Sequence, residues 1–203
     1  MDNSLEGNRR VYTKAELSME LLRKSIHMLI ALVPYIAAVL GRSGAALLLM
    51  GGVLFYVCAE GLRFFGFSLP VISGVTKAVS RKKERGRFAL APMTLGLGAL
   101  IAISVFPQTQ AAVAIYALAF GDSASTLAGK LLGRLRPAFL SGKSLEGSFA
   151  CFAVSVLTAY LVISDLKTAL AVGFVSLLID ALPLGEFDNI LLPLAAGFAA
   201  LVC

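Results

Sequence analysis

Long runs without Asp, Glu, Lys or Arg recur along the chain, separated by short polar segments. The main runs are residues 25–41, 43–59, 88–121, 147–164, 168–179 and 189–203. A helix that spans a bilayer needs about 20 largely apolar residues, and about 17 are tolerated. The run 88–121 is too long for one span and is divided near Pro107. The pattern therefore predicts an all-α, polytopic membrane protein of about seven transmembrane helices.

The last two of these helices have apolar runs shorter than a full span. The sixth reaches full length only if it includes residues 180–184, and the seventh only if it begins near Glu186. We expect residues 1–11 to form a flexible polar N-terminus and residues 12–203 to form a single integral membrane catalytic domain.

The composition excludes an ordinary water-soluble domain. Hydrophobic residues make up 58% of the 203 residues and charged residues 15%, whereas about 25% are charged in soluble domains. The net charge of +6 is compatible with nucleic-acid binding, but the basic residues lie between apolar runs. That placement favours a membrane surface, so we expect membrane lipids and no nucleic acid as partners. A homo-oligomer is left open.

The distribution of Lys and Arg predicts the orientation. If the N-terminus lies inside, all but two of the 18 basic residues, Arg42 and Lys167, fall on the inner side. Of the twelve acidic residues, only Asp165 lies outside. Positive residues are retained on the cytoplasmic side. We therefore expect the N-terminus and the active site at the cytoplasmic face of the cell membrane and the C-terminus outside.

The three cysteines, Cys58, Cys151 and Cys203, all fall in apolar runs. They show no spacing typical of a disulfide framework or a metal site. We expect them to be small buried hydrophobic residues.

The first cluster with possible chemistry leads into the first span. Glu20, Arg23, Lys24 and His27 follow an i, i+3, i+4, i+7 pattern, so they share one helix face. The functional interpretation is a stripe that faces phosphate, with His27 as proton acceptor from an alcohol. The alternative is a flank of long side chains that reach the membrane surface, with ion pairs inside the helix. His27 favours function, because a titratable group inside an apolar segment is costly.

The second cluster surrounds Asp122, about twelve residues into a helix that enters from outside. A carboxylate at membrane depth needs a partner, and a divalent metal ion is the obvious one. Gly121, Ser123 and Gly129 suggest an interrupted helix that exposes backbone N–H groups to phosphates, with Arg134 close behind. Packing of small residues between helices is the alternative.

The third cluster lies just before the fifth span and comprises Lys143, Ser144, Glu146, Gly147 and Ser148. A helix start explains the serines. A Lys and a Glu three residues apart also offer one phosphate ligand and one metal ligand.

The fourth cluster combines Asp180, Glu186, Asp188 and Asn189, a net negative patch near the C-terminal helix. Together the four clusters supply oxygen ligands and several cations but no thiol site. Hard oxygen ligands suit Mg²⁺ with a nucleotide polyphosphate. The residues therefore predict phosphoryl or nucleotidyl transfer at a membrane face.

The four motifs, in this order and spacing, resemble the dolichol, phytol and diacylglycerol kinases that use CTP, and among them the compact prokaryotic members. The resemblance implies a membrane lipid kinase that transfers the terminal phosphate of CTP to the hydroxyl of a polyprenol or dolichol, a phytol-like isoprenoid or a diacylglycerol, with Mg²⁺ or another divalent cation. It implies nucleotide- or metal-binding roles for Asp122, Lys143, Glu146, Asp188 and Asn189.

The candidate site follows from the clusters and the resemblance together. The expected catalytic residues are Asp122, Lys143 and His27. The expected nucleotide- and phosphate-binding residues are Arg23, Lys24, Gly121, Ser123, Gly129, Arg134, Ser144, Gly147, Ser148 and Asn189. The expected metal ligands are Asp122, Glu146, Glu186 and Asp188.

Two other functions remain open at this point. A cytidylyltransferase that forms a CDP-lipid would use the same nucleotide and metal but release pyrophosphate. A small transporter or channel would consume no nucleotide, and its polar residues would line a path through both leaflets.

Overall fold

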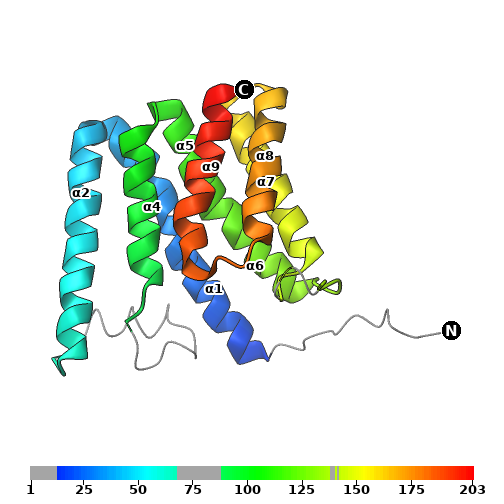
Figure 1. Cartoon of the computed structure of the whole chain (residues 1–203). Helices are drawn as coiled ribbons and strands as arrows, with labels where there is room; N and C mark the ends of the chain where they lie inside the picture. Colours follow the sequence, from blue (N-terminus) through cyan, green and yellow to red (C-terminus); the bar gives the residue numbers. More distant parts are fainter. Residues whose placement is uncertain (1–12, 68–87, 138–139, 141) are drawn as a thin grey trace.

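The computed structural model describes residues 13–67, 88–137, 140 and 142–203, and these residues are all-α (Figure 1). The expected flexible segment 1–11 lies outside the described residues. The elements are, in chain order, α1 (Lys14–Met28), the short 3₁₀-helix η1 (Leu29–Leu32), α2 (Val33–Phe64), α4 (Ala91–Val105), α5 (Gln108–Tyr116), the π-helical segment η3 (Ala117–Gly121), α6 (Asp122–Leu131), α7 (Leu145–Ile163), α8 (Leu166–Ala181), the 3₁₀-helix η5 (Gly185–Phe187) and α9 (Asp188–Val202).

Among the described residues, four helical segments are long and apolar enough to cross a membrane. They are Lys14–Arg63, Gln108–Leu131, Leu145–Ile163 and Gly185–Val202. By length and composition the chain is thus an integral membrane protein, but the prediction of about seven spans is wrong. Two of the predicted runs belong to one helical segment, Lys14–Arg63, while α4 has only 15 residues and α8 only 16.

The long N-terminal segment bends sharply at Gly41. This glycine has φ = 75°, a left-handed conformation that glycine adopts without steric cost. The next residue, Arg42, donates hydrogen bonds to the main-chain oxygens of Ile103 (2.9 Å) and Phe106 (2.7 Å) at the end of α4. These carbonyls have no partner within their own helix, so a cation that binds them stabilises the helix end. The bend therefore lets α2 run beside α4 at the edge of the bundle (Figure 1).

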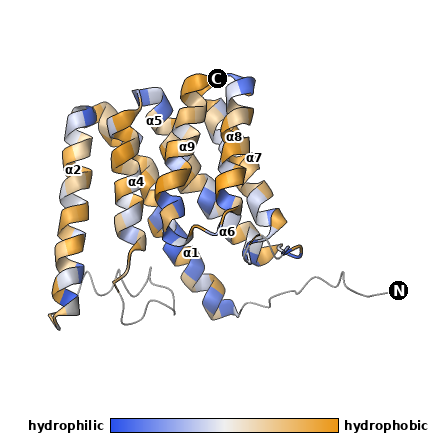
Figure 2. Cartoon of the chain, viewed as in Figure 1, coloured by the Kyte–Doolittle hydropathy of each residue, from blue (hydrophilic) through white to orange (hydrophobic). Residues whose placement is uncertain are grey.

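Two apolar clusters form the core. One lies among α5, η3, α7, α8 and α9, and the other joins α2, α4 and α5. The outward faces of the helices are also largely hydrophobic, whereas hydrophilic residues gather around α1 and the nearby parts of α6 and α9 (Figure 2). This arrangement fits a protein surrounded by hydrocarbon with a polar site on one side of the bundle.

The cysteines are only partly as expected. Cys151 is buried and its thiol approaches the main-chain oxygen of Ser176. Cys58 and Cys203 are exposed, so the prediction of burial is wrong for them. Both occupy outward-facing positions, which a count of apolar residues does not distinguish from inward-facing ones.

Candidate active site

A cavity with an empty volume of about 530 Å³ lies between α1, α4, α6 and the η5–α9 segment. Its polar lining residues belong to α1, α6, η5 and α9. Its apolar lining residues belong to α1 and α4. The polar lining residues are Arg23, Lys24, His27, Asp122, Glu186, Asp188 and Asn189. The first, second and fourth sequence clusters therefore meet in one place, although they lie far apart along the chain.

Helix α1 brings the first cluster to this cavity. Its start is defined by Thr13, whose side chain accepts from the N–H of Glu16 while the Glu16 carboxylate accepts from the N–H of Thr13. From this start, the helical period places Glu20, Lys24 and His27 on the buried side. The sequence prediction that these residues share one face is confirmed.

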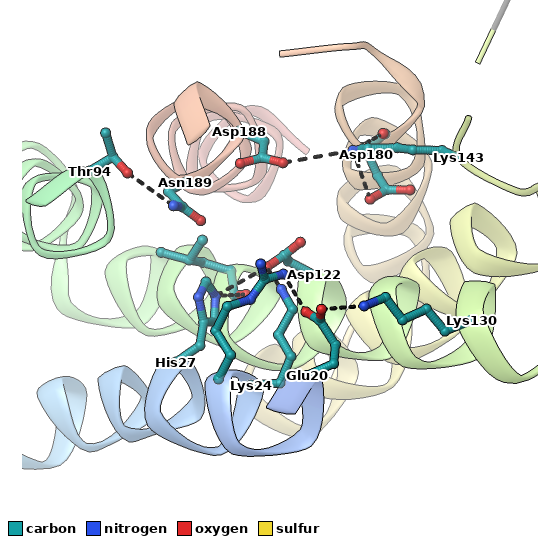
Figure 3. A network of polar contacts seen from close by, with 12 residues as sticks. Glu20, Lys24, His27, Thr94, Asp122, Lys130, Lys143, Asp180, Asp188 and Asn189 are labelled. Carbon is teal, nitrogen blue, oxygen red and sulfur yellow. Dashed lines mark hydrogen bonds and ion pairs between the residues drawn. The ribbon is translucent and has the colours of Figure 1, made fainter. Parts of the chain in front are cut away.

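Asp122 is held by two side chains of α1. The Lys24 ammonium forms an ion pair and hydrogen bond with Asp122 Oδ2, and His27 Nε2 lies 3.3 Å from the same oxygen (Figure 3). His27 Nε2 also lies 3.1 Å from the main-chain oxygen of Leu118. Because a carbonyl oxygen only accepts, this contact requires a proton on Nε2, and in the neutral ring Nδ1 is then the acceptor nitrogen. Among the described residues, Lys24 is the permanently charged side chain in direct contact with Asp122.

The helix that carries Asp122 is not interrupted. Helix α5, the π-helical segment η3 and α6 follow one another without a break from Gln108 to Leu131, so the prediction of an interrupted helix with exposed backbone N–H groups is wrong. A Cβ on Gly121 would lie 2.5 Å from Ser155 Oγ on α7. The glycine is therefore needed for close helix packing. The π-helical turn, a feature frequent at functional sites, directly precedes Asp122.

The other small residues of the second cluster also pack between helices. Gly129 lies against Gly147 and Ser144 of the α7 start, where a Cβ would lie 3.0 Å from Ser144 Oγ. Ser123 is fully buried. None of the small residues named here, Gly121, Ser123, Gly129, Ser144 and Gly147, lines the cavity, so their predicted contact with phosphate has no geometric support there.

Glu20 joins α1 to α6. Its carboxylate forms an ion pair with Lys130 on α6 (Figure 3). It also forms an ion pair with Arg23, one turn along α1. The expected site did not include Glu20 and Lys130, although the helical pattern placed Glu20 on the same face as Lys24. The pairing orients the Arg23 side chain beside the cavity.

Lys143 binds at the ends of two other helices. Its ammonium contacts the main-chain oxygen of Asp180 and lies 3.4 Å from Asp180 Oδ1 and 3.7 Å from Asp188 Oδ2. Ser148 donates to Asp180 Oδ2 at 2.8 Å. Asp180 is buried and was not among the expected site residues. The available signal was a single carboxylate at the end of an otherwise apolar run.

Glu146 and Arg134 do not reach the cavity. The Glu146 carboxylate accepts from the backbone N–H groups of Arg134 (2.8 Å) and Leu135 (3.1 Å), so it closes the loop before α7. The Arg134 side chain is exposed. Ser144 accepts from the N–H of Gly147 at 3.1 Å and caps α7. The helix-start interpretation of this cluster therefore describes Ser144 correctly.

Asn189 fixes the opposite wall of the cavity. Its side-chain amide donates to Thr94 Oγ1 on α4 at 3.0 Å (Figure 3). A Cβ on Gly98 would lie only 2.0 Å from the main-chain oxygen of Asn189, so α4 and α9 approach closely here because residue 98 is glycine. Thr94 was missed because a lone threonine in an apolar run carries no distinctive pattern.

The carboxylates of the cavity fit a magnesium ion only in part. Asp122, Glu186 and Asp188 line the same space, but within the described ranges no three His, Cys, Asp or Glu side chains form a group ready to hold a metal. Mg²⁺ usually binds one or two carboxylates together with waters and substrate phosphates. The residues therefore fit a metal site that a polyphosphate completes, and do not fit a cage made by protein alone.

Comparison with known proteins gives one informative similarity. No family model and no solved structure matches the chain. Over 84 residues the chain is 37% identical to CTP-dependent diacylglycerol kinase 1 of Eremothecium gossypii, which covers 41% of this chain and 26% of that protein. The match thus spans about a quarter of the length of this curated relative. The resemblance to CTP-using lipid kinases inferred from the motifs is thereby confirmed.

Proposed function

We propose that this protein is a membrane-embedded kinase that transfers the terminal phosphate of CTP to the hydroxyl of a lipid alcohol. The observation that carries the proposal is the cavity itself, where Arg23, Lys24, Asp122 and Asp188 meet beside an apolar wall. Cationic side chains can bind a polyphosphate, carboxylates can bind the metal ion that accompanies it, and apolar side chains can contact the chain of a lipid. The name of the curated relative supplies CTP as the donor.

In this proposal the polyphosphate is bound from α1. Arg23 and Lys24 line the cavity one residue apart in sequence, and the guanidinium of an arginine matches the geometry of phosphate oxygens. Lys143 lies beside Asp188 at the cavity edge and adds positive charge there. Glu20 keeps Arg23 in place through its ion pair.

Asp122 and Asp188, with Glu186 next to them, are the carboxylates proposed to hold Mg²⁺. When bound, such an ion neutralises charge that develops on the transferred phosphate and the leaving group. Glu146 is the weakest of the four expected ligands, because its carboxylate binds backbone N–H groups outside the cavity.

The acceptor hydroxyl is proposed to lie near His27 and Asp122. Its oxygen forms a bond to the terminal phosphorus, the bond from that phosphorus to the bridging oxygen breaks, and CDP leaves. The hydroxyl proton passes to Nδ1 of His27, the nitrogen that its contact with Leu118 leaves as acceptor, or to the Asp122 carboxylate. Catalysis then rests mostly on positioning and on stabilisation of charge.

The proposed location is the cell membrane, with the site at the cytoplasmic face, where nucleotides are available. The three acceptor classes, polyprenol or dolichol, phytol-like alcohol and diacylglycerol, all fit a cavity with one apolar side. Diacylglycerol is the first to test, because it appears in the name of the relative.

The test uses purified full-length protein in lipid nanodiscs with Mg²⁺, each of the four nucleoside triphosphates and a panel of the three alcohols. CTP carrying radioactive phosphorus in the γ position should label the lipid, whereas CTP labelled in the α position should leave its label in CDP. Label from the α position in the lipid would instead indicate cytidylyl transfer. Lack of transfer from every nucleotide to every alcohol would refute the proposal. Asp122→Asn, which keeps the side-chain volume, is the matched inactive control.

A further inference from the structure

The apolar wall of the cavity has a specific composition and position. It consists of Ile26 on α1 and of Ala91, Pro92 and Leu95 on the first turns of α4. These side chains line the same cavity as the carboxylates of α6 and α9. The cavity therefore has both charged and apolar lining residues.

Apolar side chains near Ile26 are exposed on the outside of the bundle. Leu22 and Ile26 on α1 and Leu29, the first residue of η1, follow an i, i+4, i+7 pattern. Leu22 is 50% exposed and Leu29 61% exposed, whereas Ile26 is partly buried at the cavity. In a membrane, hydrocarbon covers such exposed leucines. Residues that hydrocarbon would cover thus lie one helical turn from the apolar lining of the cavity.

The two helices that carry this apolar lining have their main packing partners elsewhere. Helix α4 packs on α2 and α9, and α1 packs on α6 and η3. The α4 wall is fixed from behind by the hydrogen bond between Asn189 and Thr94 and by the close approach at Gly98. The α1 wall is fixed by the ion pairs of Lys24 and of Glu20.

We infer that the gap between Ile26 on α1 and Leu95 on α4 is a lateral entrance through which the acceptor alcohol reaches the site from the bilayer. This inference rests on the proposed kinase function. The occupant is an amphiphile whose hydroxyl head lies toward Asp122 and His27 while the first carbons of its chain lie between Ile26, Pro92 and Leu95. Such an entrance lets the head group reach Asp122 and His27 while the chain stays in hydrocarbon. Ile26 and Leu95, which would contact the chain, are then specificity-determining residues.

The first experiment measures occupancy of the gap without using activity. The chain contains no tryptophan, so Ile26→Trp introduces a single fluorescent reporter at the entrance. The variant is reconstituted with a brominated diacylglycerol, a brominated phytol derivative or a brominated phosphatidylcholine at equal mole fraction. Bromine quenches tryptophan on contact. We expect at least one brominated alcohol to quench more strongly than the phospholipid.

The matched control is Leu54→Trp, which places the reporter on the exposed face of α2, away from the cavity. There the alcohols and the phospholipid should quench equally. Equal quenching by all three lipids in the Ile26→Trp variant as well would overturn the inference.

The second experiment fills the gap. Leu95→Trp should lower kcat/KM for the lipid acceptor by about tenfold or more, because fit in an apolar pocket discriminates on that scale. The affinity for CTP and the activity of Leu54→Trp should stay unchanged. Full lipid phosphorylation by Leu95→Trp would refute the entrance. If the wild type phosphorylates no alcohol, the kinase proposal fails, while the quenching result still decides whether alcohols occupy the gap.

Discussion

The ion pair between Lys24 and Asp122 can be tested as a unit with a double-mutant cycle. Lys24 is 4% exposed and Asp122 8%. Removing one partner of a buried ion pair leaves an uncompensated charge and costs about 3–5 kcal/mol of unfolding free energy. Both side chains also line a cavity that is wide enough for water. We therefore expect the lower end, about 3 kcal/mol, for Lys24→Met and for Asp122→Asn.

The double variant should be far less destabilised than the sum of the two changes, because it buries neither charge. If each single change costs about 3 kcal/mol, additivity predicts about 6 kcal/mol. We expect about 3–4 kcal/mol instead, which is a coupling energy of about 2–3 kcal/mol. The control pair is Asp122→Asn with Arg42→Met, because Arg42 binds at the far end of α4. That pair should be additive within about 0.5 kcal/mol.

The assay is unfolding by sodium dodecyl sulfate in mixed micelles, followed by circular dichroism, with phosphoryl transfer measured in parallel. All three variants of Lys24 and Asp122 should be inactive, while the double variant should be about as stable as either single variant instead of losing twice as much stability. Additive destabilisation by Lys24→Met and Asp122→Asn would refute the conclusion that Lys24 neutralises Asp122 inside the bundle.

Three further outcomes are expected. Gly98→Val should destabilise the fold by about 1–3 kcal/mol, because its side chain meets the Asn189 main chain, while Gly51→Ala, in open space on α2, should be neutral or slightly stabilising in the same unfolding assay. Glu146→Ala should speed hydrogen exchange of the loop amides it binds; unchanged exchange with lost activity would favour a metal-binding role. Hydrogen bonds from the first turn of α8 hold the pKa of Asp165 below its ordinary value, so its stabilisation is present above the ordinary carboxyl pKa and is lost as pH falls through the lowered one. Asp165→Asn should remove this pH dependence of unfolding.

The helical period was sufficient to predict which residues of α1 face the site. Glu20, Lys24 and His27 are close in sequence, and their common face follows from 3.6 residues per turn. Their partners could not be predicted in the same way, because Lys24 and Asp122 are 98 residues apart and meet only through the packing of the bundle. The cost of a charge at membrane depth still identified Asp122 correctly as a residue that needs a counter-charge.

Glycines and serines were the least predictable part of the site. A glycine permits close approach of any neighbour, whether a phosphate or another helix. Gly121 and Gly129 have helix α7 as that neighbour, a fact that depends on tertiary packing. For the same reason the number of spans was overestimated, since Gly41 lets one helical segment bend without the polar loop that a count of apolar runs assumes.

The charged side chains at the cavity stabilise the fold and also form the candidate site. Helix α1 exposes Met19, Leu21 and Leu22, and its polar contacts to the bundle run through Glu20, Lys24 and His27. Charges are costly in apolar surroundings unless they are paired, so these pairs position α1 as well as the candidate site. Loss of activity in a variant of any of these residues therefore does not assign a catalytic role. The Lys24 and Asp122 cycle isolates the structural role of this pair as a coupling energy in the free energy of unfolding, and the activity measured in parallel reports the chemical role.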